Sequence, residues 1–299
     1  MSRPLRLHGP NLIHHVMARG NARMAIYLDE ADHIRFLDLL GQVVHRYALA
    51  CWAYCLMTNH YHLVLQAPDD NLSSAMHRLN GVYAQWWNRR HDRVGHVTQG
   101  HFKAQVVQEE RYLMAVCRYV LLNPVRAGLS ANAADWPWSS AAATLGQTQP
   151  PRFLSTDLLL DACGGVNLDA KRTRLAALLD SEDALDLAKA IREDHRVIGD
   201  ENFVESFRAQ ATTATRGVPG RDRRLLLAPT LDALLMDPAG GTLRGRVTRA
   251  VASGHTIRAV ADALGVGRGA ASRLAGLTPT GRRPGAAGRP GTSRVHNET

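Results

Sequence analysis

The sequence predicts an α+β fold, in which helices pack against an antiparallel sheet. Three observations carry this prediction: the order of strand-like and helix-like segments, a tight turn between two neighbouring strands, and a hydrophobic content of 45% in 299 residues, enough to bury a sizeable core. No run approaches the ~20 apolar residues of a membrane span, and the N-terminus lacks the apolar stretch of a signal peptide. We therefore expect a cytoplasmic protein with no membrane partner.

The first half of the chain switches between strand and helix periodicity. Strand-like segments occupy residues 11–18, 49–56, 60–67 and 101–108. Apolar residues at helical spacing predict helices at 30–46, 73–90 and 109–122. The last of these is expected to end where Asn123 meets Pro124. Strand, helix, two strands, helix, strand, helix is the order of an α+β domain, which we assign to residues 1–145.

The second half has a different composition. Residues 153–276 are predicted to form a helical region, and residues 277–299, rich in Gly, Pro and Arg, a disordered basic tail. Of the net charge of +9, +8 falls within residues 217–299. This asymmetry indicates a polyanionic partner. The four cysteines lack paired CxxC spacing, which argues against a disulfide scaffold or a thiolate zinc site.

Two histidines flank a tyrosine in the segment "NHYH". Residues i and i+2 of a strand point to the same face, so His60 and His62 should project side by side while Tyr61 points to the opposite face. Two imidazoles at that separation can bind one divalent cation. The alternative is a chance pair in a chain with 14 histidines, with one ring at a turn or in a core hydrogen bond.

A second candidate motif is "CRYVLLNPVRAG". Tyr119 and Asn123 are four residues apart, so on a helix they share a face and could supply a nucleophile and a third metal ligand. The structural alternatives are an aromatic side chain packed on the sheet and a helix C-cap before a proline. Tyr112 and Tyr83 are the competing tyrosines. Only Tyr119 has a possible ligand four residues further on.

Basic residues in three places are candidate DNA contacts. The segment "YAQWWNRRHDR" interleaves tryptophans with arginines, a mixture typical of single-stranded nucleic-acid binding, because bases stack on rings and phosphates meet guanidinium groups. The alternative is a helix end with one core tryptophan and solvated arginines. The candidate contacts in the first domain are Arg89, Arg90, Arg93, Lys103 and Arg126.

Residues 256–276 have the form of a helix-turn-helix. Gly265 would make the turn, and the second helix, carrying Arg268 and Arg273, would enter a major groove. The alternative is a short amphipathic helical hairpin. Gly269 argues against a recognition helix, because a glycine inside a helix costs up to ~1 kcal/mol.

Four motifs in order, "MTNHYHLVLQ", "GHVTQGHFKA", "YVLLNPVRAG" and "DWPWSS", resemble the REP-associated tyrosine transposases, relatives of the single-tyrosine HUH transposases. The resemblance spans roughly residues 10–145 and implies a ferredoxin-like HUH nuclease domain that uses Mg²⁺ or Mn²⁺. By motif match, His60 and His62 would be metal ligands, Asn123 the third ligand and Tyr119 the nucleophile. His101 departs from the "QGRFK" of many relatives, which puts a phosphate contact there in doubt.

The resemblance implies DNA strand transfer. A tyrosine would attack a phosphodiester of single-stranded DNA beside a hairpin, giving a 5′-phosphotyrosine and a free 3′-hydroxyl, with REP-like palindromes as candidate targets. Two alternatives stay open: a non-catalytic, sequence-specific DNA-binding regulator that keeps the fold, and a metal-dependent DNA hydrolase. Monomer and dimer are both compatible with the sequence.

Overall fold

The computed structural model describes residues 9–109, 111–181, 197–213, 234–235, 241–253 and 255–277. The chain divides into two compact units, Met1–Pro219 and Gly220–Thr299. Of the predicted basic tail, residues 278–299 lie outside the described residues. No helix in the described ranges is long and apolar enough to cross a membrane.

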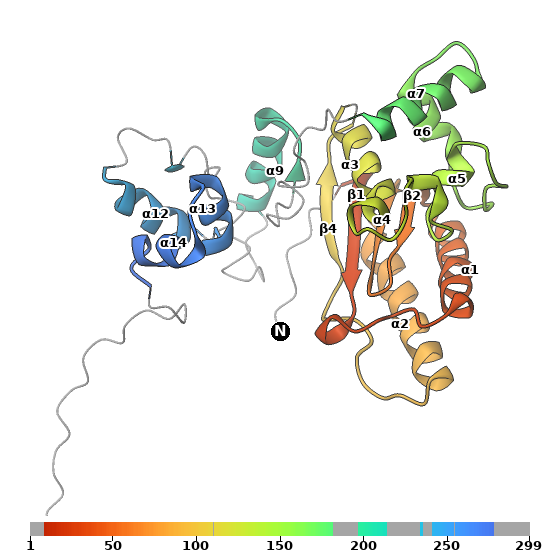
Figure 1. Ribbon diagram of the computed structural model, residues 1–299, viewed down its shortest axis with the longest axis horizontal. Coiled ribbons are helices and arrows are strands. Elements are labelled where there is room, and N and C mark those ends of the chain that lie inside the picture. The colour runs from red at the N-terminus through yellow and green to blue at the C-terminus, as the bar shows by residue number, and fades with distance from the viewer. Residues whose placement is uncertain are drawn as a thin grey trace, which may run out of the picture. The chain divides into compact units, whose positions relative to one another are not determined.

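The first unit is built around a five-stranded sheet with the strand order β2-β3-β1-β4-β5. Figure 1 labels β2, β1 and β4 of this sheet. The strands are β1 (Leu12–Arg19), β2 (Ala50–Leu56), β3 (His60–Ala67), β4 (Lys103–Val107) and β5 (Val197–Ile198). Strand β1 pairs antiparallel with β3 and β4, β2 pairs antiparallel with β3, and β5 is parallel to β4. Four of the strands match predicted segments, whereas β5 is too short for alternation to reveal it.

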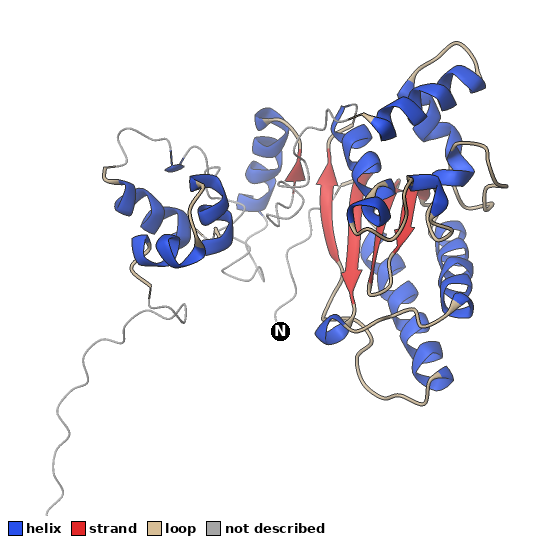
Figure 2. Cartoon of the chain, in the orientation of Figure 1, coloured by secondary structure: helices blue, strands red, loops and turns tan. Residues whose placement is uncertain are grey.

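Helices cover both faces of this sheet, which confirms the predicted α+β class (Figure 2). Helices α1 (Glu30–Arg46) and α2 (Leu72–Arg90) share one core with the sheet, and α3 (Arg111–Leu121) shares the other. The short helix α4 (Asn123–Arg126) follows α3 almost directly, with Pro124 in its first turn. Because a proline fits the first turn of a helix, Pro124 is accommodated within the first turn of α4.

Alternation along β3 divides its side chains between the two cores. Tyr61, Leu63 and Leu65 belong to the core beneath α1 and α2, and Val64 belongs to the core beneath α3. All four side chains are fully buried. The polar residues of β3 that point toward α3 are therefore held between the sheet and a helix.

The first unit continues well past residue 145. It includes η1 (Asn21–Arg23), η2 (Ala133–Asp135), α5 (Ala141–Thr144), α6 (Thr156–Cys163), α7 (Leu168–Asp180) and α9 (Glu201–Thr213). Leu159 of α6 and Leu175 of α7 pack in the same core as Val116 of α3. Arg118 of α3 donates a hydrogen bond to the carbonyl oxygen of Leu178 at 2.6 Å. The predicted boundary at 145–153 therefore does not coincide with the division of the chain, because α6 and α7 complete the α3 core.

The second unit contains α12 (Leu243–Ala252), α13 (Ile257–Leu264) and α14 (Arg268–Leu274) around a small core. Thr256 caps α13 by accepting a hydrogen bond from the Ala259 amide at 3.1 Å. Gly265 ends α13 in the left-handed conformation, with φ +64°, which glycine adopts without strain. Two helices joined by a turn are present within 256–276, and the DNA-binding role of this hairpin stays a prediction.

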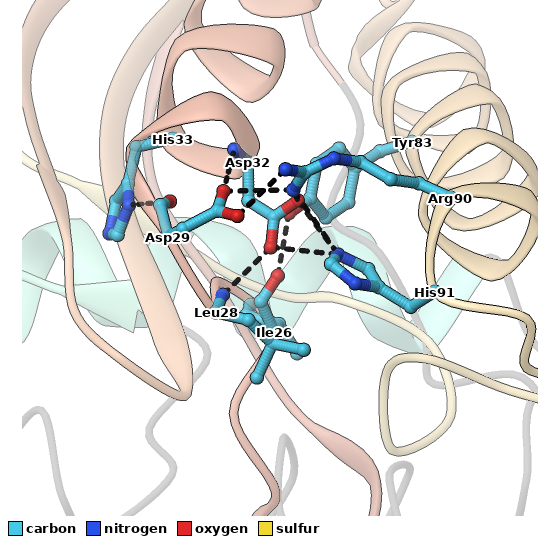
Figure 3. Close-up of polar contacts among 8 residues, drawn as sticks. All are labelled: Ile26, Leu28, Asp29, Asp32, His33, Tyr83, Arg90 and His91. Carbon is cyan, nitrogen blue, oxygen red and sulfur yellow. Dashed lines mark hydrogen bonds and ion pairs between the residues drawn. The ribbon is translucent and has the colours of Figure 1, made fainter.

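A network of charged side chains joins the start of α1 to the end of α2 (Figure 3). Asp32 is fully buried, and its carboxylate accepts from the Leu28 amide at 2.7 Å and from Arg90 Nη1 at 2.5 Å, with His91 Nε2 at 2.9 Å. Arg90 also pairs with Asp29, the N-cap of α1, at 2.7 Å. Its hydrogen bond lowers the pKa of the exposed Asp29 carboxyl to about 2. The network ties together the two helices that cover one face.

We expect Asp32→Ala to lower the free energy of unfolding by about 3 kcal/mol, because it removes one partner of a buried, hydrogen-bonded ion pair. Denaturant titration followed by circular dichroism measures this change. Asp38→Ala is the matched control, since Asp38 is an exposed carboxylate of the same helix, and it should change the stability by less than about 0.5 kcal/mol. Equal effects of the two substitutions would contradict the structural role of the network.

Candidate functional site

The two histidines of "NHYH" lie at the start of β3, on the face that α3 covers. Their ring centroids are 5.1 Å apart, and His62 is buried whereas His60 is half-buried. Tyr61 points to the other face, where its hydroxyl donates a hydrogen bond to Asn80 Oδ1 at 2.8 Å. The histidine pair therefore projects from one face, and the tyrosine between them is held in the opposite core.

Helix α3 brings Tyr119 to this pair. The half-buried ring of Tyr119 meets the ring of His62 edge-on, with a centroid distance of 5.7 Å and an interplanar angle of 87°. Tyr119 also lies edge-on to His15 of β1, at 6.0 Å. Residues from two strands and a helix thus converge at one place on the sheet.

The two competing tyrosines lie elsewhere. Tyr83 is buried in the core beneath α1 and α2, and its hydroxyl donates a hydrogen bond to the carbonyl oxygen of Ile26 at 2.6 Å. Because the sheet separates this core from the histidines, Tyr83 is not placed to reach them. Tyr112 packs on the core beneath α3, seven residues before Tyr119 on the same helix, and it remains the closer competitor of Tyr119.

Asn123 and Arg126 both contact Tyr119. Asn123 Nδ2 donates to the carbonyl oxygen of Tyr119 at 3.0 Å, and Arg126 Nη1 donates to the same oxygen at 3.1 Å. The Arg126 guanidinium carbon lies 4.8 Å from the centroid of the Tyr119 ring, a cation–π contact. Since the Asn123 amide nitrogen bonds to the backbone, its oxygen is the atom that it can offer to a cation.

His15, which the sequence reasoning missed, is the closest polar neighbour of His62. Its ring is fully buried, and His15 Nε2 lies 2.9 Å from His62 Nδ1. On the other side, His15 Nδ1 lies 3.0 Å from Oε1 of Gln105 on β4. Only the register of β1 against β3 and β4 shows this contact, because alternation identifies the face of a residue but not its neighbours on other strands.

His60 has a hydrogen-bond partner of its own. His60 Nδ1 lies 2.7 Å from Asn59 Oδ1, and Asn59 Nδ2 donates to the carbonyl oxygen of Arg23 at 2.9 Å. Because that second bond requires the amide nitrogen, the oxygen of Asn59 faces His60. His60 Nδ1 therefore carries the hydrogen, and its Nε2 keeps a lone pair.

The environment keeps the histidines neutral. Burial lowers the pKa of His15 to about 4, and burial together with the nearby Arg19 cation lowers the pKa of His60 to about 4. Burial, with His15, His60 and Arg19 nearby, lowers the pKa of His62 well below its usual range. A neutral imidazole is the form that binds a cation, so the chemical state of His60 and His62 fits metal ligation.

A cation bound by His60 and His62 would need further ligands that are not acidic side chains. Among the residues that the structure describes, no group of three His, Cys, Asp or Glu side chains could hold a metal ion. A cation held by His60 and His62 would therefore complete its coordination with an amide oxygen, water or substrate oxygens. Asn123, beside Tyr119, is the candidate amide.

Basic side chains border the histidine pair. Arg19 is the register partner of His60, and Lys103, at the start of β4, pairs with Met17, which is itself the register partner of His62. Arg19 and Lys103 are both exposed. Lys103 was among the predicted DNA contacts, whereas Arg19 was missed because nothing in the sequence pairs it with His60.

The arginines at the end of α2 differ in their surroundings. Arg90 is held by Asp29 and Asp32 and lies 5.5 Å from the Trp86 ring, so its charge is already compensated within the protein. Arg89 and Arg93 are exposed. One of the two neighbouring tryptophans, Trp87, is buried in the core, as the structural alternative expected.

The loop after α2 returns to the histidine end of the sheet. Residues Gly20 and Thr98 form an isolated antiparallel bridge, and the Gln99 amide donates to the carbonyl oxygen of Arg19 at 2.7 Å. His101, the residue that departs from the expected motif, is exposed in this loop. The loop that leads to β4 therefore passes beside Arg19, the register partner of His60.

Comparison with known proteins gives three similarities. Residues 9–122 match the family model described as "Transposase IS200 like". A putative REP-associated tyrosine transposase of Haemophilus influenzae is 26% identical over 121 residues, which cover 36% of this chain and 69% of that protein. A solved structure of a REP-associated tyrosine transposase bound to a REP hairpin is similar with a TM-score of 0.43 and 17% identity, covering 56% of this chain and 94% of that chain.

We expect a nuclear magnetic resonance titration to give His60 a pKa of about 4, because its ring is desolvated and Arg19 opposes a second positive charge. Arg19→Gln removes that cation and should raise the pKa of His60, while burial still holds it below 6.5. Arg46→Gln, which changes an exposed arginine at the end of α1, is the control and should leave the titration unchanged. A His60 midpoint near 6.5 in the unmodified protein would contradict this description of the site.

Proposed function

We propose that this chain is a DNA strand transferase with Tyr119 as its nucleophile, because residues 9–122 match the model of the IS200-like transposases and the chain is similar to a REP-associated tyrosine transposase. The observation that carries the proposal is the packing of Tyr119 against His62, beside His60, on one face of the sheet. A candidate nucleophile and two candidate metal ligands thus meet at one place that exposed cations border.

In this proposal His60 and His62, each through Nε2, and Asn123, through its amide oxygen, would hold a divalent cation. Such a cation would neutralise charge on the phosphate oxygens. Imidazole nitrogen suits Mn²⁺ better than it suits Mg²⁺, which prefers oxygen ligands and retains its water. We therefore propose Mn²⁺ or Mg²⁺ as the cofactor, with tighter binding of Mn²⁺.

The protein's own groups carry out a transesterification. The Tyr119 oxygen attacks phosphorus and forms a new P–O bond, the bond from phosphorus to the 3′-oxygen breaks, and that oxygen leaves as a 3′-hydroxyl after taking up a proton. The phenol loses its proton, which is difficult at neutral pH because the ordinary tyrosine pKa is near 10. We propose that Arg126, whose guanidinium carbon lies 4.8 Å from the centroid of the Tyr119 ring, stabilises the negative charge that develops on the attacking oxygen. The energy of the phosphodiester is kept in the 5′-phosphotyrosine, so strands can be rejoined without a nucleotide cofactor.

We propose single-stranded DNA next to a hairpin as the substrate, with palindromes of the REP type as the first candidates, because the relative from Haemophilus influenzae is named for its association with REP sequences. Lys103 and Arg19 would contact phosphates near the histidines. The second unit would add affinity, since Arg268 and Arg273 of α14 are exposed while Ala271 of the same helix faces the core.

We expect the unmodified protein, with Mn²⁺ and a hairpin oligonucleotide that carries single-stranded flanks, to form a covalent protein–DNA adduct that survives denaturing electrophoresis. Tyr119→Phe should abolish the adduct, because phenylalanine has no oxygen to attack phosphorus. Tyr112→Phe is the matched control on the same helix and should keep it.

The other outcomes separate the competing functions. Loss of the adduct in Tyr112→Phe but not in Tyr119→Phe would identify Tyr112 as the nucleophile instead. Cleavage that survives in Tyr119→Phe and leaves free 5′-phosphate ends would indicate a hydrolase. Binding of hairpin DNA without an adduct in any variant would favour a non-catalytic regulator.

We expect the double substitution Arg268→Gln and Arg273→Gln to weaken DNA binding and to reduce the slope of log affinity against log salt by about 1–2, because each lost phosphate contact removes about 0.9 from that slope. Fluorescence anisotropy at several salt concentrations measures the slope. Arg258→Gln is the control, because Arg258 lies on the other helix of the hairpin, α13. Its Nε is 3.8 Å from Oδ2 of Asp262, so its charge is paired within that helix. An unchanged slope in the double variant would exclude α14 as a phosphate-binding surface.

A further inference from the structure

A chain of buried polar side chains crosses three strands and ends at His62. Gln105 of β4, His15 of β1 and His62 of β3 are 2%, 0% and 4% exposed. Gln105 Oε1 lies 3.0 Å from His15 Nδ1, and His15 Nε2 lies 2.9 Å from His62 Nδ1. The ring centroids lie 5.1 Å apart, almost as far as the 2.9 Å contact between the two nitrogens allows, and the ring planes differ by 12°. The contact therefore lies close to the plane of both rings, where N–H groups and lone pairs point.

The acceptor oxygen of Gln105 sets the direction of both hydrogen bonds in this row of side chains. Gln105 Oε1 carries no hydrogen, so His15 Nδ1 must donate to it. A neutral imidazole has one N–H, which leaves His15 Nε2 as an acceptor. His62 Nδ1 must then donate to His15, and the single lone pair of His62 remains on Nε2.

Asn59 imposes the same state on His60 by a separate route. Its Nδ2 donates to the Arg23 carbonyl oxygen, so its Oδ1 accepts from His60 Nδ1. Both histidines of the pair consequently keep Nε2 free of hydrogen. Two separate sets of hydrogen bonds, one from β4 through β1 and one from the turn before β3, leave a lone pair on Nε2 of both histidines.

We propose that His15 and Gln105 are positioning residues that hold His62 in the tautomer with hydrogen on Nδ1, as Asn59 does for His60, so that both rings present Nε2 to a divalent cation. The part of this proposal in which the two Nε2 atoms bind a cation rests on the proposed function. Hydrogen bonds of this kind to metal-binding histidines orient the ring and typically change the metal affinity by roughly 10–100-fold when removed. Neither His15 nor Gln105 needs to touch the cation or the DNA.

The tautomer itself can be measured in metal-free protein. Long-range ¹H–¹⁵N spectra distinguish a protonated ring nitrogen from one with a lone pair, and we expect His62 and His60 each to show Nδ1–H and bare Nε2 at pH 7.5. His15→Leu removes the acceptor and should produce a mixture of tautomers at His62 while leaving His60 unchanged. His15→Gln places an amide oxygen near the position of Nε2 and should restore the Nδ1–H form.

Mn²⁺ binding gives the second readout. Electron paramagnetic resonance of free Mn²⁺ should show affinity roughly 10–100-fold weaker in His15→Leu, with recovery in His15→Gln. Gln105→Leu frees His15 to adopt either tautomer and should give a smaller loss. Ile13→Val perturbs the same face of β1 without removing a hydrogen bond and should change neither readout.

The outcomes separate this inference from the proposed function. If His62 carries its hydrogen on Nε2 in the unmodified protein, or if His15→Leu leaves both tautomer and Mn²⁺ affinity unchanged, the inference is overturned. If the tautomers are as expected but no adduct forms with any hairpin, the positioning role stands and the proposed function fails. Should His15→Leu not fold, the tautomer of the unmodified protein and the Gln105→Leu variant still decide the question.

Discussion

The structure depends on the alternation of side chains along a strand that is covered on both faces. In β3 one set of residues fills the core beneath α1 and α2, and the residues between them face α3. Because neither face is open to water along most of the strand, a polar residue placed there must find partners within the protein. His62 does so through His15, and Tyr61 does so through Asn80 on the other side.

This constraint explains why the histidines of the candidate site are neutral. Desolvation disfavours the charged imidazole, and each ring that loses water gains a neighbour that fixes its hydrogen. Helix α3 closes the same face and carries Tyr119, whose carbonyl oxygen is bonded by both Asn123 and Arg126. The nucleophile candidate is therefore held by the backbone beneath it as well as by the rings beside it.

Much of the fold could be predicted because its periodicities are strong. Helix α1 begins and ends where its apolar spacing indicated, and β3 has its predicted bounds. The apolar faces of α6 and α7 do not reveal in the sequence that their packing partner is α3. The pairing of His60 with His62 follows from local alternation. By contrast, His15, Gln105 and Arg19 reach the site through strand register, and a single sequence carries no signal for which strands are neighbours.

We propose Tyr119, next to the histidine pair, as the residue that bonds to DNA. Trypsin cleaves after arginine, and Arg111, Arg118 and Arg126 separate Tyr112 and Tyr119 into two adjoining peptides. Mass spectrometry of a tryptic digest of the covalent adduct therefore distinguishes them directly. We predict the nucleotide on the peptide of residues 119–126, and its presence on the peptide of residues 112–118, or on neither, would contradict the assignment of Tyr119 as the nucleophile.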